Sequence, residues 1–190
     1  GCEEFVIITN PEFEDLIKKV TTEAFPSLNL KFATQDEPKG ISHALKQAEV
    51  HVDRDEKILF ILGDNFFEKN PIIDFDFSQY KKGSYIFTKS VNNPQEFGVA
   101  QMNSNGNVVS IDEKPIAPKS DLAVVGIYIF DETVFEKIST LSPSSRGEYE
   151  ITDLCNIYVQ ENTCRNFVID GWWIDAGTPD RIIELEEKLP

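Results

Sequence analysis

The first third of the chain alternates between stretches with the hydrophobic period of a strand and stretches with that of a helix. Strands are predicted at 5–9, 28–35 and 57–64, and helices at 11–25 and 40–52. The apolar positions that give the two helices their spacing are Phe13, Leu16, Ile17 and Val20, then Ile41, Ala44, Leu45 and Ala48. The continuous apolar run at 57–64 is typical of a parallel sheet covered on both faces. This order predicts a wound α/β sheet with right-handed crossovers.

The second half is richer in strands and turns. Residues 97–115 read as two strands around Asn105 and Gly106, a dipeptide typical of hairpins. The other predicted elements are strands at 84–91 and 122–131, a strand pair in 167–177, and helices at 131–140, 148–162 and 178–189. No repeat or low-complexity linker interrupts them, so residues 1–190 are predicted to form a single domain.

Two helices carry further local signals. In 148–162 one face is apolar, formed by Ile151, Leu154, Cys155 and Tyr158. In 178–189 Thr178 stands at a plausible N-cap and Pro179 at the first helical position.

Charge and cysteine content exclude several functional classes. The 190 residues include 18 basic and 33 acidic side chains, a formal net charge of −15, and no Lys/Arg cluster. Binding to a nucleic acid polymer or an anionic membrane is therefore not expected, because both need a basic face. Cys2, Cys155 and Cys164 lack metal-type spacing, and Cys155 fits a small core residue. With no membrane-length apolar stretch and no signal peptide, a cytoplasmic protein is expected.

Two carboxylates end apolar strands: Asp64 in ILGDN and Asp175 in WWIDAGT. Ligands bind at the carboxyl ends of strands in open α/β sheets, and two aspartates meeting there would repel unless a cation lay between them. Mg²⁺ prefers such oxygen ligands together with phosphate oxygens. Alternatively, each aspartate caps a turn through its own backbone. For either residue alone the turn is the better interpretation, and for the pair the metal is.

Basic candidates are few. Arg146, beside Glu148, Glu150 and Asp153, could grip a phosphate at a helix entrance, or could belong to a solvated, charged helix face. Lys114 suits a phosphate, and the adjacent Glu113 suits sugar hydroxyls, although neither residue is specific by itself.

The loop QDEPKG, residues 35–40, lies between a strand and a helix. Gln35 could pair with the edge of a base, while a plain turn explains the same residues. His43 and His51 are too far apart for one helical metal site and are interpreted as surface or core-edge residues.

Taken together these stretches resemble the sugar-1-phosphate nucleotidyltransferases, most closely the thymidylyltransferases that act on glucose 1-phosphate. The motifs run in the family's order over nearly the whole chain: QDEPKGISHA, LGDNFF, NPQEFGVA, IDEKP, LAVVGIYIFD, SSRGEYEITDLCNIY and WWIDAGTPD. The resemblance implies an α/β, Rossmann-like nucleotide-diphospho-sugar transferase fold, with a mixed, mostly parallel sheet flanked by helices. It also implies attack of a sugar 1-phosphate on the α-phosphorus of a nucleoside triphosphate, giving an NDP-sugar and pyrophosphate.

The resemblance also implies roles for individual residues. Asp64 and Asp175 would hold Mg²⁺, while Lys114 and Arg146 would hold the sugar phosphate. The residues expected to contact the base are Gln35 and Gly40, and Pro38 between them is expected to bind the substrate. Those expected to line the sugar pocket are Gly98, Glu113, Gly126 and Tyr128.

The chain departs from the family's pattern at its beginning. Family members begin with a strand and a glycine-rich GxGTR loop, followed later by a lysine before a proline. Here the opening GCEEFVIITN resembles the family's second strand, and the sequence contains no GxG. We therefore expect the N-terminal strand to be missing and the sequence to represent a fragment.

Three functional hypotheses follow. The first is an Mg²⁺-dependent enzyme acting on a hexose 1-phosphate, with dTTP favoured over UTP. The second is a noncatalytic sugar-nucleotide-binding or regulatory relative without the triphosphate loop, and the third is a structural fragment without activity. The expected partners are the nucleoside triphosphate and the sugar 1-phosphate, and homo-oligomerisation is left open.

Overall fold

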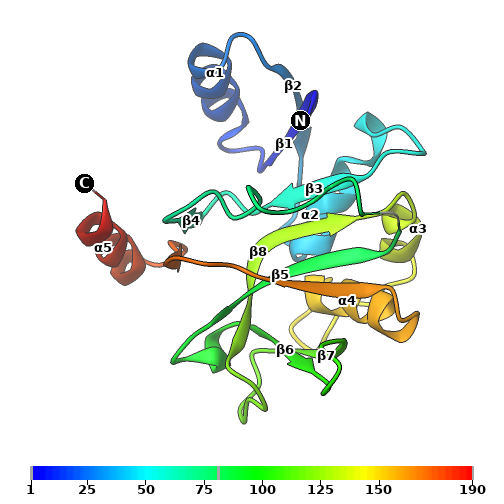
Figure 1. The fold of residues 1–190 in the computed structure, drawn as a ribbon. Helices are drawn as coiled ribbons and strands as arrows, with labels where there is room; N and C mark the ends of the chain where they lie inside the picture. Colours follow the sequence, from blue (N-terminus) through cyan, green and yellow to red (C-terminus); the bar gives the residue numbers. More distant parts are fainter. Residues whose placement is uncertain (1, 81, 190) are drawn as a thin grey trace. The chain divides into compact units, whose positions relative to one another are not determined.

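The computed structural model describes residues 2–80 and 82–189 (Figure 1). The backbone divides into two compact units: Gly1–Glu56 with Glu132–Leu154, and Lys57–Asp131 with Cys155–Pro190. Helix α4, Ile151–Gln160, begins in the first unit and ends in the second. The single domain expected from the sequence stays a prediction.

The first unit is built on a parallel strand pair. Strands β1 and β2 pair in register from Glu4 opposite Asn29 to Thr9 opposite Thr34, with α1 as the crossover. The elements are β1 (Glu4–Thr9), α1 (Glu14–Ala24), β2 (Asn29–Thr34), α2 (Ile41–Gln47), a 3-10 turn (Glu49–His51) and α3 (Val134–Ile138). The predicted β-α-β beginning is therefore confirmed.

Helices of this unit are tied together by side chains. Lys46 on α2 donates to the Ser139 hydroxyl at 2.8 Å and to the Phe135 carbonyl at 3.2 Å, which links α2 to α3. The predicted apolar spacing of α1 is present, and the side chains of Phe13 at its N-cap and of Leu16 and Val20 within it are exposed.

The second unit contains the six-stranded sheet and the two-stranded β10–β4 sheet. Strand order is β7-β6-β8-β5-β9, and β3 also pairs with β8. The elements are β3 (Ile58–Ile61), β4 (Asn65–Phe67), β5 (Ser84–Ser90), a 3-10 turn (Pro94–Glu96), β6 (Gly98–Met102), β7 (Val108–Glu113), β8 (Leu122–Phe130), β9 (Cys164–Val168), β10 (Trp173–Asp175) and α5 (Pro179–Lys188). The predicted hairpin is confirmed, because β6 and β7 pair antiparallel from Gly98 opposite Glu113.

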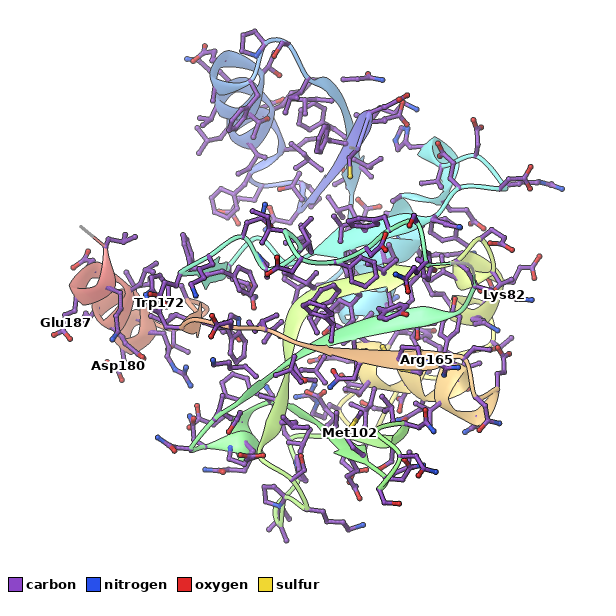
Figure 2. All side chains as sticks on the ribbon, viewed as in Figure 1. Lys82, Met102, Arg165, Trp172, Asp180 and Glu187 are labelled. Atoms are coloured by element: carbon purple, nitrogen blue, oxygen red, sulfur yellow. The ribbon has the colours of Figure 1, made fainter. Side chains whose placement is uncertain are left out.

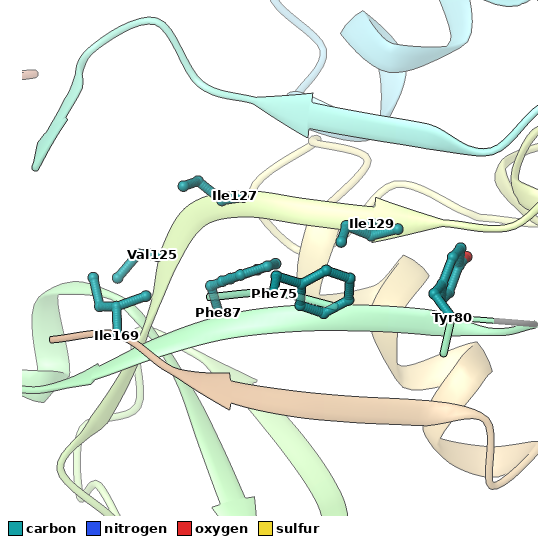
Figure 3. Packing of buried hydrophobic residues seen from close by; sticks show 7 residues of the cluster. All are labelled: Phe75, Tyr80, Phe87, Val125, Ile127, Ile129 and Ile169. Atoms are coloured by element: carbon teal, nitrogen blue, oxygen red, sulfur yellow. The ribbon is translucent and has the colours of Figure 1, made fainter. Parts of the chain in front are cut away.

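The core of this unit lies along one face of β8 (Figure 3). Val125, Ile127 and Ile129 alternate along β8 and share this face, as the two-residue period of a strand requires. Phe75 and Phe87 pack against them; each Phe contributes about 1.5–3 kcal/mol when fully buried. The core therefore fixes β8, whose middle carries the predicted site residues Gly126 and Tyr128.

Two strand predictions are corrected. The run at 57–64 forms only β3, which is antiparallel to β8 and not part of a parallel sheet. The strand ends because the chain turns back at Leu62, whose carbonyl accepts from the Asn65 N–H at 3.3 Å. An apolar run reports burial, whereas strand direction depends on which neighbour lies beside it.

The predicted strand pair within 167–177 also divides differently. Strand β9 begins earlier, at Cys164, and is parallel to β5, while β10 is antiparallel to β4. The α/β class with a mixed sheet flanked by helices is confirmed. Among the described residues only the β1–β2 and β5–β9 pairs are parallel, so the parallel share is smaller than the sequence indicated.

Helix α5 begins where the sequence predicted, with Thr178 as N-cap and Pro179 first, although the Thr178 side chain makes no capping hydrogen bond. The core placement of Cys155 is confirmed, since the residue is buried. Among the described helices, each is too short or too polar to cross a membrane.

Candidate active site

Asp64 and Asp175 lie at the same end of the short β4–β10 pair. Asp175 pairs with Asn65, and the Ala176 N–H donates to the Asp64 carbonyl at 2.7 Å. A Cβ atom placed on Gly177 would lie 3.0 Å from Asp175 Oδ1 and 3.5 Å from Asp64 Oδ2. Both carboxylates therefore approach one point beside Gly177, as the sequence led us to expect. In Figure 2 residues 173–179 run between the labelled Trp172 and Asp180.

Part of the turn interpretation is also present. Asp175 Oδ1 accepts the Gly177 N–H at 3.0 Å, and Asp64 Oδ1 accepts from the Asn65 amide at 2.8 Å. Within the described part of the chain, no group of three or more His, Cys, Asp or Glu side chains is arranged to hold a metal. A two-carboxylate site suits Mg²⁺, which usually keeps several waters and takes its remaining ligands from substrate phosphates.

Glu113 and Lys114 follow one another at the end of β7. Glu113 lies opposite Gly98, and the Lys114 N–H donates to the Phe97 carbonyl at 3.0 Å. Lys114 has a φ of +42°, a left-handed conformation that costs a residue with a Cβ atom energy. Such strain concentrates at functional positions, where the surrounding structure holds it in place.

Tyr128 is a buried residue of β8. Its ring stacks with Phe130 at 5.9 Å between centroids and lies 6.1 Å from Phe60. Burial raises the pKa of the Tyr128 phenol well above its usual range, and electrostatic interactions with Cys155, Glu113 and Asp175 raise it further. The phenol is thus a neutral group, and its predicted contact with the sugar stays a prediction.

Asn65 is a site residue that was not predicted from the sequence. Its amide contacts Asp64, the Gly126 N–H and the Trp173 indole at 2.8, 3.1 and 2.7 Å. The only signal in the sequence is its place directly after Asp64, which does not reveal contacts to residues 61 and 108 positions away.

Gln35 and Gly40 lie together in the first unit. The Gln35 amide donates to the Gly40 carbonyl at 3.1 Å and lies 3.0 Å from His43 Nδ1. Gly40 has a φ of +100°, and a Cβ atom there would lie 2.7 Å from the Tyr149 carbonyl oxygen. Local geometry alone therefore requires this glycine, while Pro38 two residues earlier belongs to the same loop.

Arg146 is held by two carboxylates of the first unit. Its Nε and Nη2 donate to Glu150 at 3.1 and 2.9 Å, and Nη2 also donates to Glu148 at 3.2 Å. The Glu150 side chain is only 8% exposed and also accepts from the Ser144 hydroxyl at 2.6 Å. This bidentate pair orders the guanidinium. Burial and the charge of Glu150 raise the pKa of Asp153.

The structure therefore brings the candidates together in separate groups. One contains Asp64, Asp175 and Gly126, which Asn65 connects, and another contains Gly98, Glu113 and Lys114. In the first unit Gln35 and Gly40 share a loop, and Arg146 forms its own cluster with Glu148 and Glu150.

The fold matches those of two solved structures. A UDP-glucose pyrophosphorylase complexed with UDP-glucose superposes with a TM-score of 0.83 at 22% identity, over 99% of this chain and 81% of that one. A Bacillus anthracis structure in complex with sucrose is provisionally assigned as a glucose-1-phosphate thymidylyltransferase. It superposes with a TM-score of 0.87 at 35% identity, over 98% of this chain and 76% of that one.

The profile of the nucleotidyl transferase family matches residues 1–190, and the chain belongs to this family. It is 33% identical to a glucose-1-phosphate thymidylyltransferase of Neisseria meningitidis, over 97% of the chain and 65% of that protein. It is 36% identical to the low-salt glycan biosynthesis nucleotidyltransferase Agl11 of Haloferax volcanii, over 85% of the chain and 46% of that protein. The chain thus spans about half to two thirds of the length of these relatives.

Proposed function

We propose that this protein transfers a nucleotidyl group from a nucleoside triphosphate to glucose 1-phosphate, giving an NDP-glucose and pyrophosphate. The observation that carries the proposal is the approach of Asp64 and Asp175 to one point beside Gly177, in a chain of the nucleotidyl transferase family. Several relatives are glucose-1-phosphate thymidylyltransferases, which supports dTTP over UTP as the donor.

In the proposed reaction an oxygen of the sugar phosphate attacks the α-phosphorus. The new bond joins that oxygen to phosphorus, and the bond to the bridging oxygen of the β-phosphate breaks, so pyrophosphate leaves with its electrons. Such a transfer needs alignment and charge neutralisation more than covalent help. Mg²⁺, when bound, would neutralise charge on the phosphate oxygens.

Residues of the second unit have separate proposed roles in binding the cation and the sugar phosphate. Asp64 and Asp175 would hold the cation, with the turn at Gly177 leaving room beside both carboxylates. Lys114 would bind a sugar-phosphate oxygen, and Glu113 would accept hydrogen bonds from sugar hydroxyls. The strained backbone of Lys114 supports a functional role for its side chain, because a glycine there would relieve the strain.

The residues of the first unit have their own proposed roles. Gln35 and Gly40 would contact the base, Pro38 would bind the substrate, and Arg146 would bind the phosphate of the sugar. The pairing of Arg146 with Glu150 would reduce the entropy that the guanidinium loses on binding.

The decisive assay incubates the full-length protein with Mg²⁺, glucose 1-phosphate and either dTTP or UTP, and measures pyrophosphate and NDP-glucose. With both donors we expect one pyrophosphate to be released for each NDP-glucose formed, and a higher kcat/KM for dTTP than for UTP. Calorimetric binding of the NDP-sugar without any pyrophosphate release would instead identify a noncatalytic relative.

The three free thiols fit the reducing interior of a cell, which we propose as its location.

A further inference from the structure

The side chain of Asn65, beside the two aspartates, makes three hydrogen bonds. The residue begins β4, and its amide contacts groups from two other segments of the second unit. Its Oδ1 accepts from the Gly126 N–H of β8 at 3.1 Å and from the Trp173 indole of β10 at 2.7 Å. Its Nδ2 donates to Asp64 Oδ1 at 2.8 Å.

These partners determine the orientation of the amide. A backbone N–H and an indole N–H can only donate, so the atom between them must be the oxygen of Asn65. The NH₂ group is then directed at Asp64, where a carboxylate can only accept. This charge-assisted bond is stronger than a neutral one.

The room for the amide comes from Gly126. A Cβ atom on Gly126 would lie 2.7 Å from both Cγ and Nδ2 of Asn65, closer than side-chain atoms approach one another. The close approach of the β8 backbone therefore keeps the amide in place, and the predicted sugar-pocket residue Gly126 has a structural task as well.

The amide has a direct consequence for Asp64. Because Oδ1 is held by Asn65, the other oxygen, Oδ2, is the one that faces the turn at Gly177, where Asp175 Oδ1 also lies. We propose that Asn65 is a positioning residue, whose amide holds the Asp64 carboxylate with Oδ2 directed toward Asp175. The proposal rests on the function proposed above, in which these two aspartates share a cation.

Two substitutions in the full-length protein separate positioning from folding. Asn65→Asp keeps an acceptor for Gly126 and Trp173, but replaces the donor toward Asp64 with a like charge. In its metal-free crystal structure we expect the Asp64 carboxylate to turn away from residue 65. Asn65→Ala removes the donor without adding charge, and its dissociation constant for Mn²⁺ alone, followed by electron paramagnetic resonance, should rise by about 10–100-fold.

Asn156 supplies the matched control. Its amide also bridges backbone groups of the second unit, accepting from the Ile111 N–H at 2.9 Å and donating to the Ile111 carbonyl at 2.7 Å. Asn156→Ala and Asn156→Asp should lower the melting temperature without changing the Mn²⁺ dissociation constant.

The outcomes are distinguishable. If Asp64 keeps its orientation in Asn65→Asp, or if Asn156→Ala weakens Mn²⁺ binding as much as Asn65→Ala, Asn65 is not a positioning residue. If Asp64→Asn leaves the Mn²⁺ binding of the wild-type protein unchanged, the shared cation itself is wrong, and the inference is overturned together with that part of the proposed function.

Discussion

Asp175 lies opposite Asn65 across the antiparallel β4–β10 pair, and this register puts Asp64 and Asp175 at one end of the pair. The Ala176 N–H closes that end by donating to the Asp64 carbonyl at 2.7 Å. Two acidic side chains are thus held together by backbone hydrogen bonds, which do not depend on the charge of either carboxylate.

The first prediction tests this pair. Asp64→Asn and Asp175→Asn should each lower kcat by at least about 100-fold, because each removes a proposed metal ligand. The melting temperature should change little, since backbone bonds hold the strand ends and the amide has the volume of the carboxylate. Pyrophosphate release and calorimetry measure both quantities. Near-normal turnover of either variant would contradict the metal assignment.

The second prediction concerns Gly126. Gly126→Ala should lower the free energy of unfolding by about 1–3 kcal/mol, because its Cβ atom would press on the Asn65 amide. Gly63→Ala is the control, since nothing lies within 4 Å of a Cβ there. That control should stay within about 0.5 kcal/mol of the wild type in urea unfolding. Equal losses in the two variants would mean that the contact with Asn65 is unimportant.

The third prediction uses the strained backbone of Lys114. Lys114→Gly should raise the free energy of unfolding by up to about 1 kcal/mol, because glycine adopts positive φ without strain. It should also raise the KM for glucose 1-phosphate, because the ammonium group proposed to bind the phosphate is lost. Asn162, with a φ of +58°, offers a comparison. Asn162→Gly should change stability less, as asparagine tolerates this region, and should leave KM unaltered. A destabilised Lys114→Gly would argue against strain at this position.

The fourth prediction concerns the cysteines. Cys2 is exposed, whereas Cys155 and Cys164 are buried, and burial raises the pKa of both buried thiols. Because the thiolate is the reactive form, iodoacetamide should label Cys2 of the native protein and reach the other two only in denaturant. Peptide mass spectrometry distinguishes the sites. Rapid native labelling of Cys155 would show that α4 opens readily.

The sequence predicted much of the fold because period and turn chemistry are local. The helices and the hairpin at Asn105 and Gly106 followed from short motifs. The approach of Asp64 to Asp175 was expected from a general rule about strand ends in α/β sheets, and not from a local pattern. The direction of β3 did not follow, because it depends on β8, which lies more than sixty residues later in the chain.

Asn65 shows the same limit within the site. Its type and its position beside Asp64 were visible, but its partners Gly126 and Trp173 are brought to it only by the packing of β8 and β10. Gly40 and Gly126 were predicted as ligand-contacting residues, and both turn out to lie where a Cβ atom would collide with protein atoms. A motif glycine therefore indicates close approach without saying what approaches.

The last prediction separates the two tasks of Arg146. Arg146→Ala should raise the KM for glucose 1-phosphate by about tenfold or more with little change in kcat. This rise in KM corresponds to the free energy of one lost charge-assisted hydrogen bond. It should also lower the free energy of unfolding by about 1–3 kcal/mol, because the largely buried Glu150 loses its guanidinium partner. Adding Glu150→Gln to Arg146→Ala removes that carboxylate charge, so the double variant should regain stability but keep the raised KM. Steady-state kinetics and urea unfolding on both variants give the answer. Recovery of KM in the double variant would mean that Arg146 acts on the fold and not on the sugar phosphate.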